Sequence, residues 1–156
     1  MRTLHFLILM MLMPAVLRAE NPATLTVTQV VDGDTFWGTD AGGQRIKVRL
    51  IGVDAPESRK TGHKPEGFYG KEAKAYLTRL LMNQRVRLAY DKSARDRYGR
   101  TLAYVYLADG TFVNDLLVQK GYAKAIYYKP NGKYREQLSR SCKNAQQSGA
   151  GMWQQR

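Results

Sequence analysis

Apolar and polar residues alternate along several short stretches of the chain, and this spacing of two is typical of half-buried β-strands. The clearest example covers residues 44–51, where Ile46, Val48 and Leu50 share one face and basic residues share the other. The same pattern predicts further strands at residues 25–31, 35–37, 85–90 and 101–107. Asp-Gly pairs and glycine-rich stretches between them indicate tight turns.

A different spacing, of three or four residues, predicts three helices. The first has its apolar residues at Ala73, Tyr76, Leu77, Leu80 and Leu81. A second is expected at residues 113–120, and a third runs from about Tyr134 to the glycines near position 150. Residues 58–68, with glycines, a proline and charges, predict an exposed loop. Because the first helix falls between the third and fourth of five strands, the order predicts an α+β fold on a small closed barrel of the OB type.

The first nineteen residues follow a pattern of their own. Arg2 precedes an unbroken apolar run at residues 6–13, and the stretch that follows it ends in the small residue Ala19. This order is typical of a cleavable secretory signal, and the run is too short to span a membrane. An amphipathic helix fits poorly, because no polar residue interrupts the run. We therefore predict a signal peptide at residues 1–19, one domain at residues 20–156, a periplasmic or secreted protein, and no stable membrane insertion.

The chain carries 25 lysines and arginines against 13 aspartates and glutamates, a net charge of +12. Such a field attracts polyanions, and nucleic acids, anionic membranes and heparin-like polymers are all compatible with it. The only histidines are His5 and His63, and His5 would leave with the signal peptide. A catalytic pair of histidines and a zinc site of several histidines are therefore excluded. Any phosphodiester chemistry would need carboxylates, arginines and a hard metal ion.

Three segments carry more charged groups than a scaffold needs. Residues 31–35 read Val-Asp-Gly-Asp-Thr, which alone is a common turn signal. Residues 48–57 place one arginine, two carboxylates and a proline at the end of an apolar strand. Residues 96–100, Asp-Arg-Tyr-Gly-Arg, predict a basic hairpin tip with one aromatic ring. Each segment is a weak signal by itself.

Together, and in this order, these segments resemble the staphylococcal nuclease family. The resemblance rests on Asp32-Gly33-Asp34-Thr35, on Arg49-Leu50 with residues 53–57, on Tyr98-Gly99-Arg100, and on residues 124–131. It implies an OB-fold barrel with three helices, one bound calcium ion, and cleavage of DNA and RNA that leaves 3′-phosphate ends.

The resemblance also implies roles for particular residues. The carboxylates of Asp34 and Asp54 and the backbone carbonyl of Ala55 would bind calcium. The family more often has threonine in place of Ala55, but a carbonyl ligand does not depend on the side chain. The catalytic residues would be Arg49, Glu57 and Arg100.

The chemistry of these residue types agrees with the resemblance. Calcium takes about six to eight oxygen ligands, so two carboxylates and a carbonyl leave positions for water and a phosphate oxygen. Two arginines, Arg49 and Arg100, can hold phosphate oxygens with paired donors that lysine cannot match. Glu57 would either accept a proton from the attacking water or only orient that water, and the sequence leaves both roles open.

Aromatic and basic side chains are expected to bind the rest of the substrate. These substrate-binding residues would be Arg97, Tyr98, Tyr127 and Tyr128. Stacking on tyrosine tolerates any base, which favours low sequence specificity. Tyr127 and Tyr128 are adjacent, and adjacent side chains on a strand face opposite ways, so the alternative is that one of them packs in the core.

Two other functions are compatible with parts of the sequence. A non-catalytic OB-fold module that binds nucleic acid would need the barrel and the charge, but not these carboxylates and arginines. A basic protein that coats anionic surfaces would have no use for Asp34, Asp54 and Glu57. The combination favours a monomeric enzyme that acts on DNA and RNA.

Overall fold

The computed structural model describes residues 23–60, 62 and 65–154, so the predicted signal peptide lies outside the described residues. Five strands form a closed barrel: β1 (Thr24–Asp32), β2 (Thr35–Thr39), β3 (Arg45–Leu50), β5 (Arg85–Ala89) and β6 (Thr101–Tyr106). Their order around the barrel is β1-β2-β3-β6-β5. β3 and β6 are parallel, whereas the other neighbouring strands are antiparallel.

Alternation along the strands decides which side chains fill the barrel. In β3, Val48 and Leu50 are buried while Arg45 is exposed. The core is completed by side chains of the other strands, among them Leu25, Val27, Phe36, Val86, Leu88 and Val105. Each fully buried side chain of this kind stabilises the fold by roughly 1.5–3 kcal/mol. The predicted OB-type barrel is confirmed.

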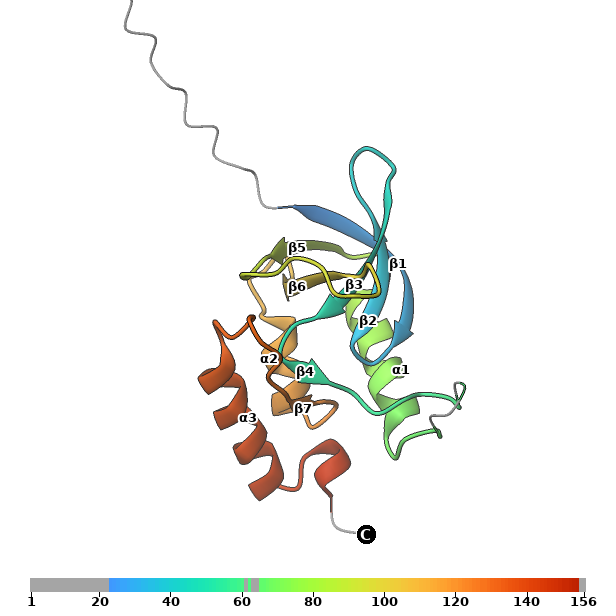
Figure 1. Ribbon diagram of the computed structural model, residues 1–156. Helices are drawn as coiled ribbons and strands as arrows, with labels where there is room; N and C mark the ends of the chain where they lie inside the picture. The colour runs from blue at the N-terminus through green and yellow to red at the C-terminus, as the bar shows by residue number, and fades with distance from the viewer. Residues whose placement is uncertain (1–22, 61, 63–64, 155–156) are drawn as a thin grey trace, which may run out of the picture.

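The described chain has three α-helices: α1 (Gly70–Leu81) and α2 (Val113–Gln119) pack on the barrel, and α3 (Arg135–Gln147) packs on α2. α1 follows the third barrel strand, as predicted, and buries Ala73, Leu77 and Leu81 at a spacing of four. It packs against β1, whereas α2 packs between β6 and α3 (Figure 1). A short 3₁₀ helix, Gly151–Trp153, ends the described chain. None of the described helices has the length and apolarity needed to cross a membrane.

A second, two-stranded sheet was not predictable by periodicity, because its strands have only two residues each. β4 (Val53–Asp54) pairs with β7 (Lys124–Ala125) in antiparallel fashion. The amide of Ile126 also donates to the carbonyl of Gly52 at 3.0 Å. This small sheet fastens the segment after β7 beside the end of β3, and so helps to shape the cleft described next.

Candidate active site

An open cleft with a volume of about 720 Å³ lies at one side of the barrel. We call residues 32–35, at the turn from β1 to β2, and residues 49–57, from the end of β3 through β4, the barrel wall. We call residues 93–100 and 128–131 the loop wall. The cleft brings together nearly all of the predicted site residues: Asp34, Arg49, Asp54, Ala55, Glu57, Arg97, Tyr98, Arg100 and Tyr128.

Two glycines let the barrel wall fold tightly. After β3 the chain turns at Gly52, whose φ of +77° lies in the left-handed region that favours glycine. Gly33 lies so close to its neighbours that a Cβ there would come within 2.6 Å of Ala55 and 2.8 Å of Ala73. This approach allows the amide of Ala55 to donate to Oδ2 of Asp34 at 2.8 Å. Side chains from two separate turns therefore meet in one place.

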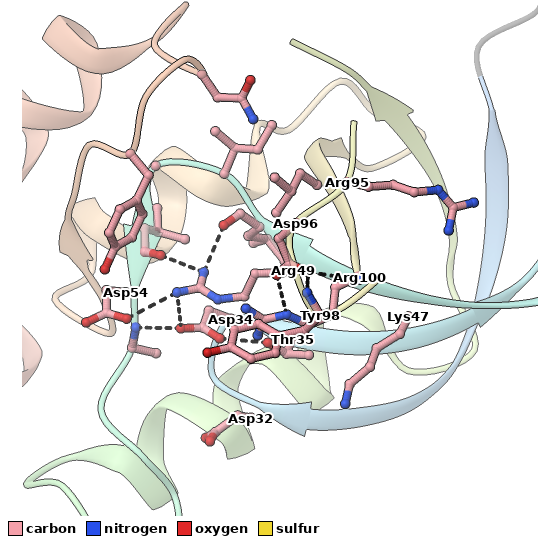
Figure 2. A pocket seen from close by; sticks show the side chains of 18 of the residues that line it. Asp32, Asp34, Thr35, Lys47, Arg49, Asp54, Arg95, Asp96, Tyr98 and Arg100 are labelled. Carbon is pink, nitrogen blue, oxygen red and sulfur yellow. Dashed lines mark hydrogen bonds and ion pairs between the residues drawn. The ribbon is translucent and has the colours of Figure 1, made fainter. Parts of the chain in front are cut away.

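Arg49 lies at the centre of the barrel wall (Figure 2). Its Nη1 donates to the carbonyl oxygens of Leu50 at 2.8 Å and Val53 at 2.6 Å. Its Nη2 lies 3.2 Å from Oδ2 of Asp34 and 3.1 Å from Oδ1 of Asp54. Only 13% of the side chain is exposed. These four contacts hold the planar guanidinium in one orientation at the edge of the cleft.

Asp32 also lines the cleft, although its sequence context predicts only a turn. Its Oδ1 accepts hydrogen bonds from the amides of Gly33 and Ser58, both at 3.0 Å. Burial raises the pKa of Asp32, and its hydrogen bond with Glu57 raises it further, while the amide of Gly33 lowers it. Asp32 therefore fixes the segment that carries Glu57. Its spacing of two from Asp34 is the signal that could have identified it.

On the loop wall, Asp96 organises the hairpin tip. Its Oδ1 accepts hydrogen bonds from the amides of Tyr98 at 2.9 Å and Arg100 at 3.0 Å, and its Oδ2 accepts from Nε of Arg100 at 2.7 Å. Burial opposes ionisation, but these hydrogen bonds, led by the Arg100 side chain, lower the pKa of Asp96. Because the ion pair uses Nε, it does not occupy Nη1 or Nη2 of Arg100.

The two adjacent tyrosines occupy different surroundings. Tyr128 lines the cleft with 67% of its surface exposed, much like Tyr98 at 68%. Tyr127 is not among the lining residues, and the guanidinium of Arg135 lies 4.4 Å from its ring centroid. Neither ring is in the core. The geometry therefore favours Tyr128 over Tyr127 as a substrate contact.

A pair of hydrogen bonds attaches the Tyr128 segment to the rest of the loop wall. The amide of Ser93 donates to Oδ1 of Asn131 at 2.8 Å, and Nδ2 of Asn131 donates back to the carbonyl of Ser93 at 2.8 Å. Asn131 is buried, so these bonds are protected from water. Asn131 belongs to the segment 124–131 that carries the family resemblance, but the sequence does not indicate the two hydrogen bonds of its side-chain amide.

The residues expected to hold calcium are compatible with a hard cation. Oδ2 of Asp34 and Oδ1 of Asp54 both lie within 3.2 Å of the same Arg49 nitrogen, so the two carboxylates already face one cation, and the backbone amide of Ala55 donates to Asp34. Within the described part of the chain no three His, Cys, Asp or Glu side chains gather into a metal site. Two carboxylates and a carbonyl would suffice here, and such an all-oxygen set suits calcium rather than zinc.

A closed OB barrel that gathers carboxylates and arginines in one open cleft has the arrangement of an enzyme acting on phosphodiesters. Comparison with known proteins makes this class more specific. The family model described as staphylococcal nuclease homologue matches residues 47–155, which is more than half of the chain. The chain belongs to the staphylococcal nuclease family and is a nuclease.

Curated relatives agree with this membership over most of the chain. It is 46% identical over 133 residues to the thermonuclease of Staphylococcus hyicus, covering 85% of this chain and 77% of the relative. It is 47% identical over 128 residues to the thermonuclease of Staphylococcus intermedius, covering 82% and 74%. Endonuclease YncB of Bacillus subtilis is 34% identical over 131 residues, covering 83% and 61%.

Proposed function

We propose that this nuclease hydrolyses the phosphodiester backbone of DNA and RNA in a calcium-dependent reaction, with little sequence preference, and leaves 3′-phosphate ends. The observation that carries the proposal is the placement of Arg49 and Arg100 on opposite walls of a cleft that also contains Asp34, Asp54 and Glu57. A module that only binds nucleic acid has no need for this arrangement.

The two arginines would bind the phosphate that is cleaved. Negative charge accumulates on its oxygens in the transition state, and donors that are already oriented stabilise that charge without reorganising. Arg49 is oriented by backbone carbonyls and carboxylates, and Arg100 by Asp96. Planar guanidiniums offer paired donors to phosphate oxygens, which an ammonium group cannot. For Arg49 this requires that the Asp34 and Asp54 oxygens that contact its Nη2 turn to the calcium ion when it is bound.

The carboxylates have separate tasks. Asp34, Asp54 and the carbonyl of Ala55 would hold calcium, which when bound polarises the phosphate and orients water. Glu57, beside Asp32, deprotonates or positions the attacking water. Water attacks phosphorus, the bond to the 5′ oxygen of the next nucleotide breaks, and that oxygen takes up a proton. The products are a 3′-phosphate and a 5′-hydroxyl.

The rest of the loop wall would bind substrate without reading its sequence. Tyr98 and Tyr128 offer exposed rings, and Arg97 donates from Nη2 to the Tyr98 hydroxyl at 2.6 Å. Stacking and charge act on every base and every phosphate, so they support low specificity. Neither stacking on a tyrosine nor a contact to a phosphate requires a deoxyribose, so we expect RNA as well as DNA to be a substrate.

The test is release of acid-soluble fragments from DNA and RNA with calcium, with excess calcium chelator, and with magnesium. We expect activity with calcium, none with chelator, and poor activity with magnesium, which sheds its waters reluctantly. The fragments should prime a polymerase only after phosphatase treatment, because their 3′ ends carry phosphate. Full activity in excess chelator would contradict the calcium proposal, and directly extendable fragments would contradict the cleavage position.

We also propose that the protein is exported as a monomer after removal of residues 1–19. Support comes from Arg2, the apolar run at residues 6–13 and the small residue Ala19. Mass measurement of protein from the periplasm or medium should give an N-terminus near Glu20 and the mass of one chain. A chain that starts at Met1 and is released only by detergent would contradict cleavage.

A further inference from the structure

The outer face of β2 and β3 carries a row of residues that the proposed mechanism does not use. Trp37 of β2 pairs with Lys47 of β3, and the neighbouring pairs are Thr39 with Arg45 and Thr35 with Arg49. Side chains two residues apart share a face, so Arg45, Lys47 and Arg49 point away from the buried Val48 and Leu50. A basic row therefore runs from the active site outward along β3.

Trp37 lies in the middle of this row and is covered by a fixed cation. The Arg45 guanidinium carbon lies 4.5 Å from the centroid of the indole ring. Nη2 of Arg45 donates to Oε1 of Gln29 at 2.6 Å, and Gln29 pairs with Trp37 across β1 and β2. The guanidinium thus reaches from β3 over β2 to β1, held by the ring below it and the amide beyond it. The result is a cationic surface that is backed by an aromatic ring.

Lys47 connects this surface to the cleft. Its ammonium nitrogen lies 5.5 Å from the centroid of the Trp37 ring, and the residue lines the cleft together with Arg49. In the view of Figure 2, Lys47 lies on the far side of Arg49 from Asp54. A strand of substrate leaving the active site on this side would meet Lys47 first and the pair of Trp37 and Arg45 next.

We propose that Gln29, Trp37, Arg45 and Lys47 form an outer subsite for an unpaired nucleotide beyond the cleaved phosphate. Lys47 binds a phosphate of the flanking nucleotide, and its base stacks on the Arg45 guanidinium backed by Trp37. The inference rests on the proposed cleavage of nucleic acid and extends it to substrate length. It predicts that single strands long enough to reach the subsite bind more tightly than a dinucleotide.

The competing explanation is that Arg45 only covers Trp37 and stabilises the sheet. A surface cation–π contact contributes about 0.5–1 kcal/mol and needs no ligand. Two observations favour the subsite: the row is continuous with the cleft through Lys47, and the platform combines a ring with cations as single-strand binding surfaces do. Stability and substrate binding can be measured separately, which distinguishes the two explanations.

Fluorescence gives a direct test, because Trp37 and Trp153 are the two tryptophans of the chain. Trp153 lies in the C-terminal 3₁₀ helix, away from the barrel (Figure 1). The double variant Trp153→Phe, Glu57→Gln would report on Trp37 while slowing cleavage. With calcium present, a ten-nucleotide single strand should change the Trp37 emission saturably, and a dinucleotide phosphodiester should not. Unchanged emission at oligonucleotide concentrations that saturate binding would overturn the subsite.

Kinetics provide the second arm. Trp37→Leu and Lys47→Gln should each raise KM for the oligonucleotide about tenfold, and KM for the dinucleotide much less. Lys143→Gln on α3 is the matched control for loss of one charge, and Trp153→Phe for loss of one tryptophan; both should leave the two KM values unchanged. If Trp37→Leu does not fold, Arg45→Gln replaces it, because this variant also removes the proposed stacking surface and should raise the same KM. Equal KM changes for both substrates, or none, would overturn the inference while oligonucleotide cleavage by the unaltered chain still supports the proposed nuclease.

Discussion

The two walls of the cleft are held in place by different means. On the barrel wall, backbone groups set the geometry: carbonyls orient Arg49, and the amide of Ala55 orients Asp34. On the loop wall, polar side chains set the geometry. Asp96 holds Arg100 through its Nε, and Asn131 ties the Tyr128 segment to Ser93. The backbone next to the barrel strands therefore orients one side of the cleft, and a few polar side chains orient the other.

This difference separates stability from catalysis on the two sides. The barrel wall cannot shift unless strands shift, so changes there should affect both folding and activity. The loop wall depends on local contacts that the barrel does not need, so changes there should affect activity first. The two arginines make this contrast testable, because they share a proposed task but not a mode of support.

The largest expected effect is that of Arg49→Lys and Arg100→Lys on catalysis. Each should lower kcat by about 10²–10³-fold, or about 3–4 kcal/mol, because an ammonium group cannot supply the paired donors. Arg49→Lys should also lower the free energy of unfolding by about 1–3 kcal/mol, since two carbonyls and two carboxylates lose a donor. Arg100→Lys should change it by less than about 0.5 kcal/mol.

The measurements are kcat at saturating DNA and urea unfolding. Calcium binding is followed by calorimetry in each variant, so that a lost metal ion is not mistaken for a lost arginine. Lys143→Gln serves as the charge control. If both variants bind calcium and keep near-normal kcat, the two-arginine mechanism is wrong; equal losses of stability would remove the contrast between the walls.

Asp96→Asn tests the loop wall alone and should have a smaller effect. The amide oxygen can still accept from the backbone of Tyr98 and Arg100, so the hairpin tip is kept, but the ion pair to Nε is lost. We expect kcat to fall about tenfold, the effect of one charged hydrogen bond, with calcium affinity unchanged. The free energy of unfolding should fall by about 1 kcal/mol at pH 7, because a lowered pKa of Asp96 adds stability to the folded state. An unchanged kcat would mean that the substrate alone positions Arg100.

The barrel was predictable from sequence because its signal is local. Residues 44–51 alternate cleanly, and β3 occupies residues 45–50 with the expected face buried. The helices were equally predictable, because apolar residues at helical spacing form the buried face of α1. The β4–β7 pair was not predictable, because two-residue strands show no period and their pairing joins distant segments. Ser58 is buried within a predicted exposed loop, because its amide donates to Asp32.

The site was partly predictable for a related reason. The family motifs marked nine residues that the fold brings to one cleft, but they do not report how those residues are supported. The sequence predicts only a turn at Asp32, although its carboxylate contacts the Glu57 segment. Strand alternation predicts opposite directions for Tyr127 and Tyr128, but neither residue lies in a strand. The directions of the two side chains depend on tertiary contacts. The Arg135 guanidinium packs on the Tyr127 ring, and two hydrogen bonds between Asn131 and Ser93 hold the segment that carries Tyr128.

Asp91→Asn should weaken the loop wall through its attachment to the barrel, with a pH-dependent effect on stability. Oδ2 of Asp91 accepts from the Tyr104 hydroxyl at 2.8 Å and the Lys133 amide at 3.0 Å. Burial opposes ionisation, but these bonds lower the pKa of Asp91. A lowered pKa adds stability that is present above the unfolded-state value, about 4, and is lost as pH falls through the folded-state value.

The variant should therefore be less stable than the native chain by about 1 kcal/mol at pH 7, and the gap should narrow below about pH 4. Urea unfolding at a series of pH values measures this, with Glu72→Gln as an exposed change of the same charge. A gap that stays constant from pH 7 to pH 3 would show that the carboxylate charge contributes nothing.

The smallest expected effect distinguishes the adjacent tyrosines. Tyr128 lines the cleft, so Tyr128→Leu should raise KM for single-stranded DNA about fivefold, near the low end for a lost stacking platform because the ring is largely exposed. Tyr127→Leu should leave KM within about twofold, since its ring packs against Arg135 outside the cleft. Steady-state kinetics on one oligonucleotide compare the two directly. A larger KM change for Tyr127→Leu, with unfolding unaltered, would mean that substrate reaches beyond the loop wall toward α3, and the cleft would have to be extended on that side.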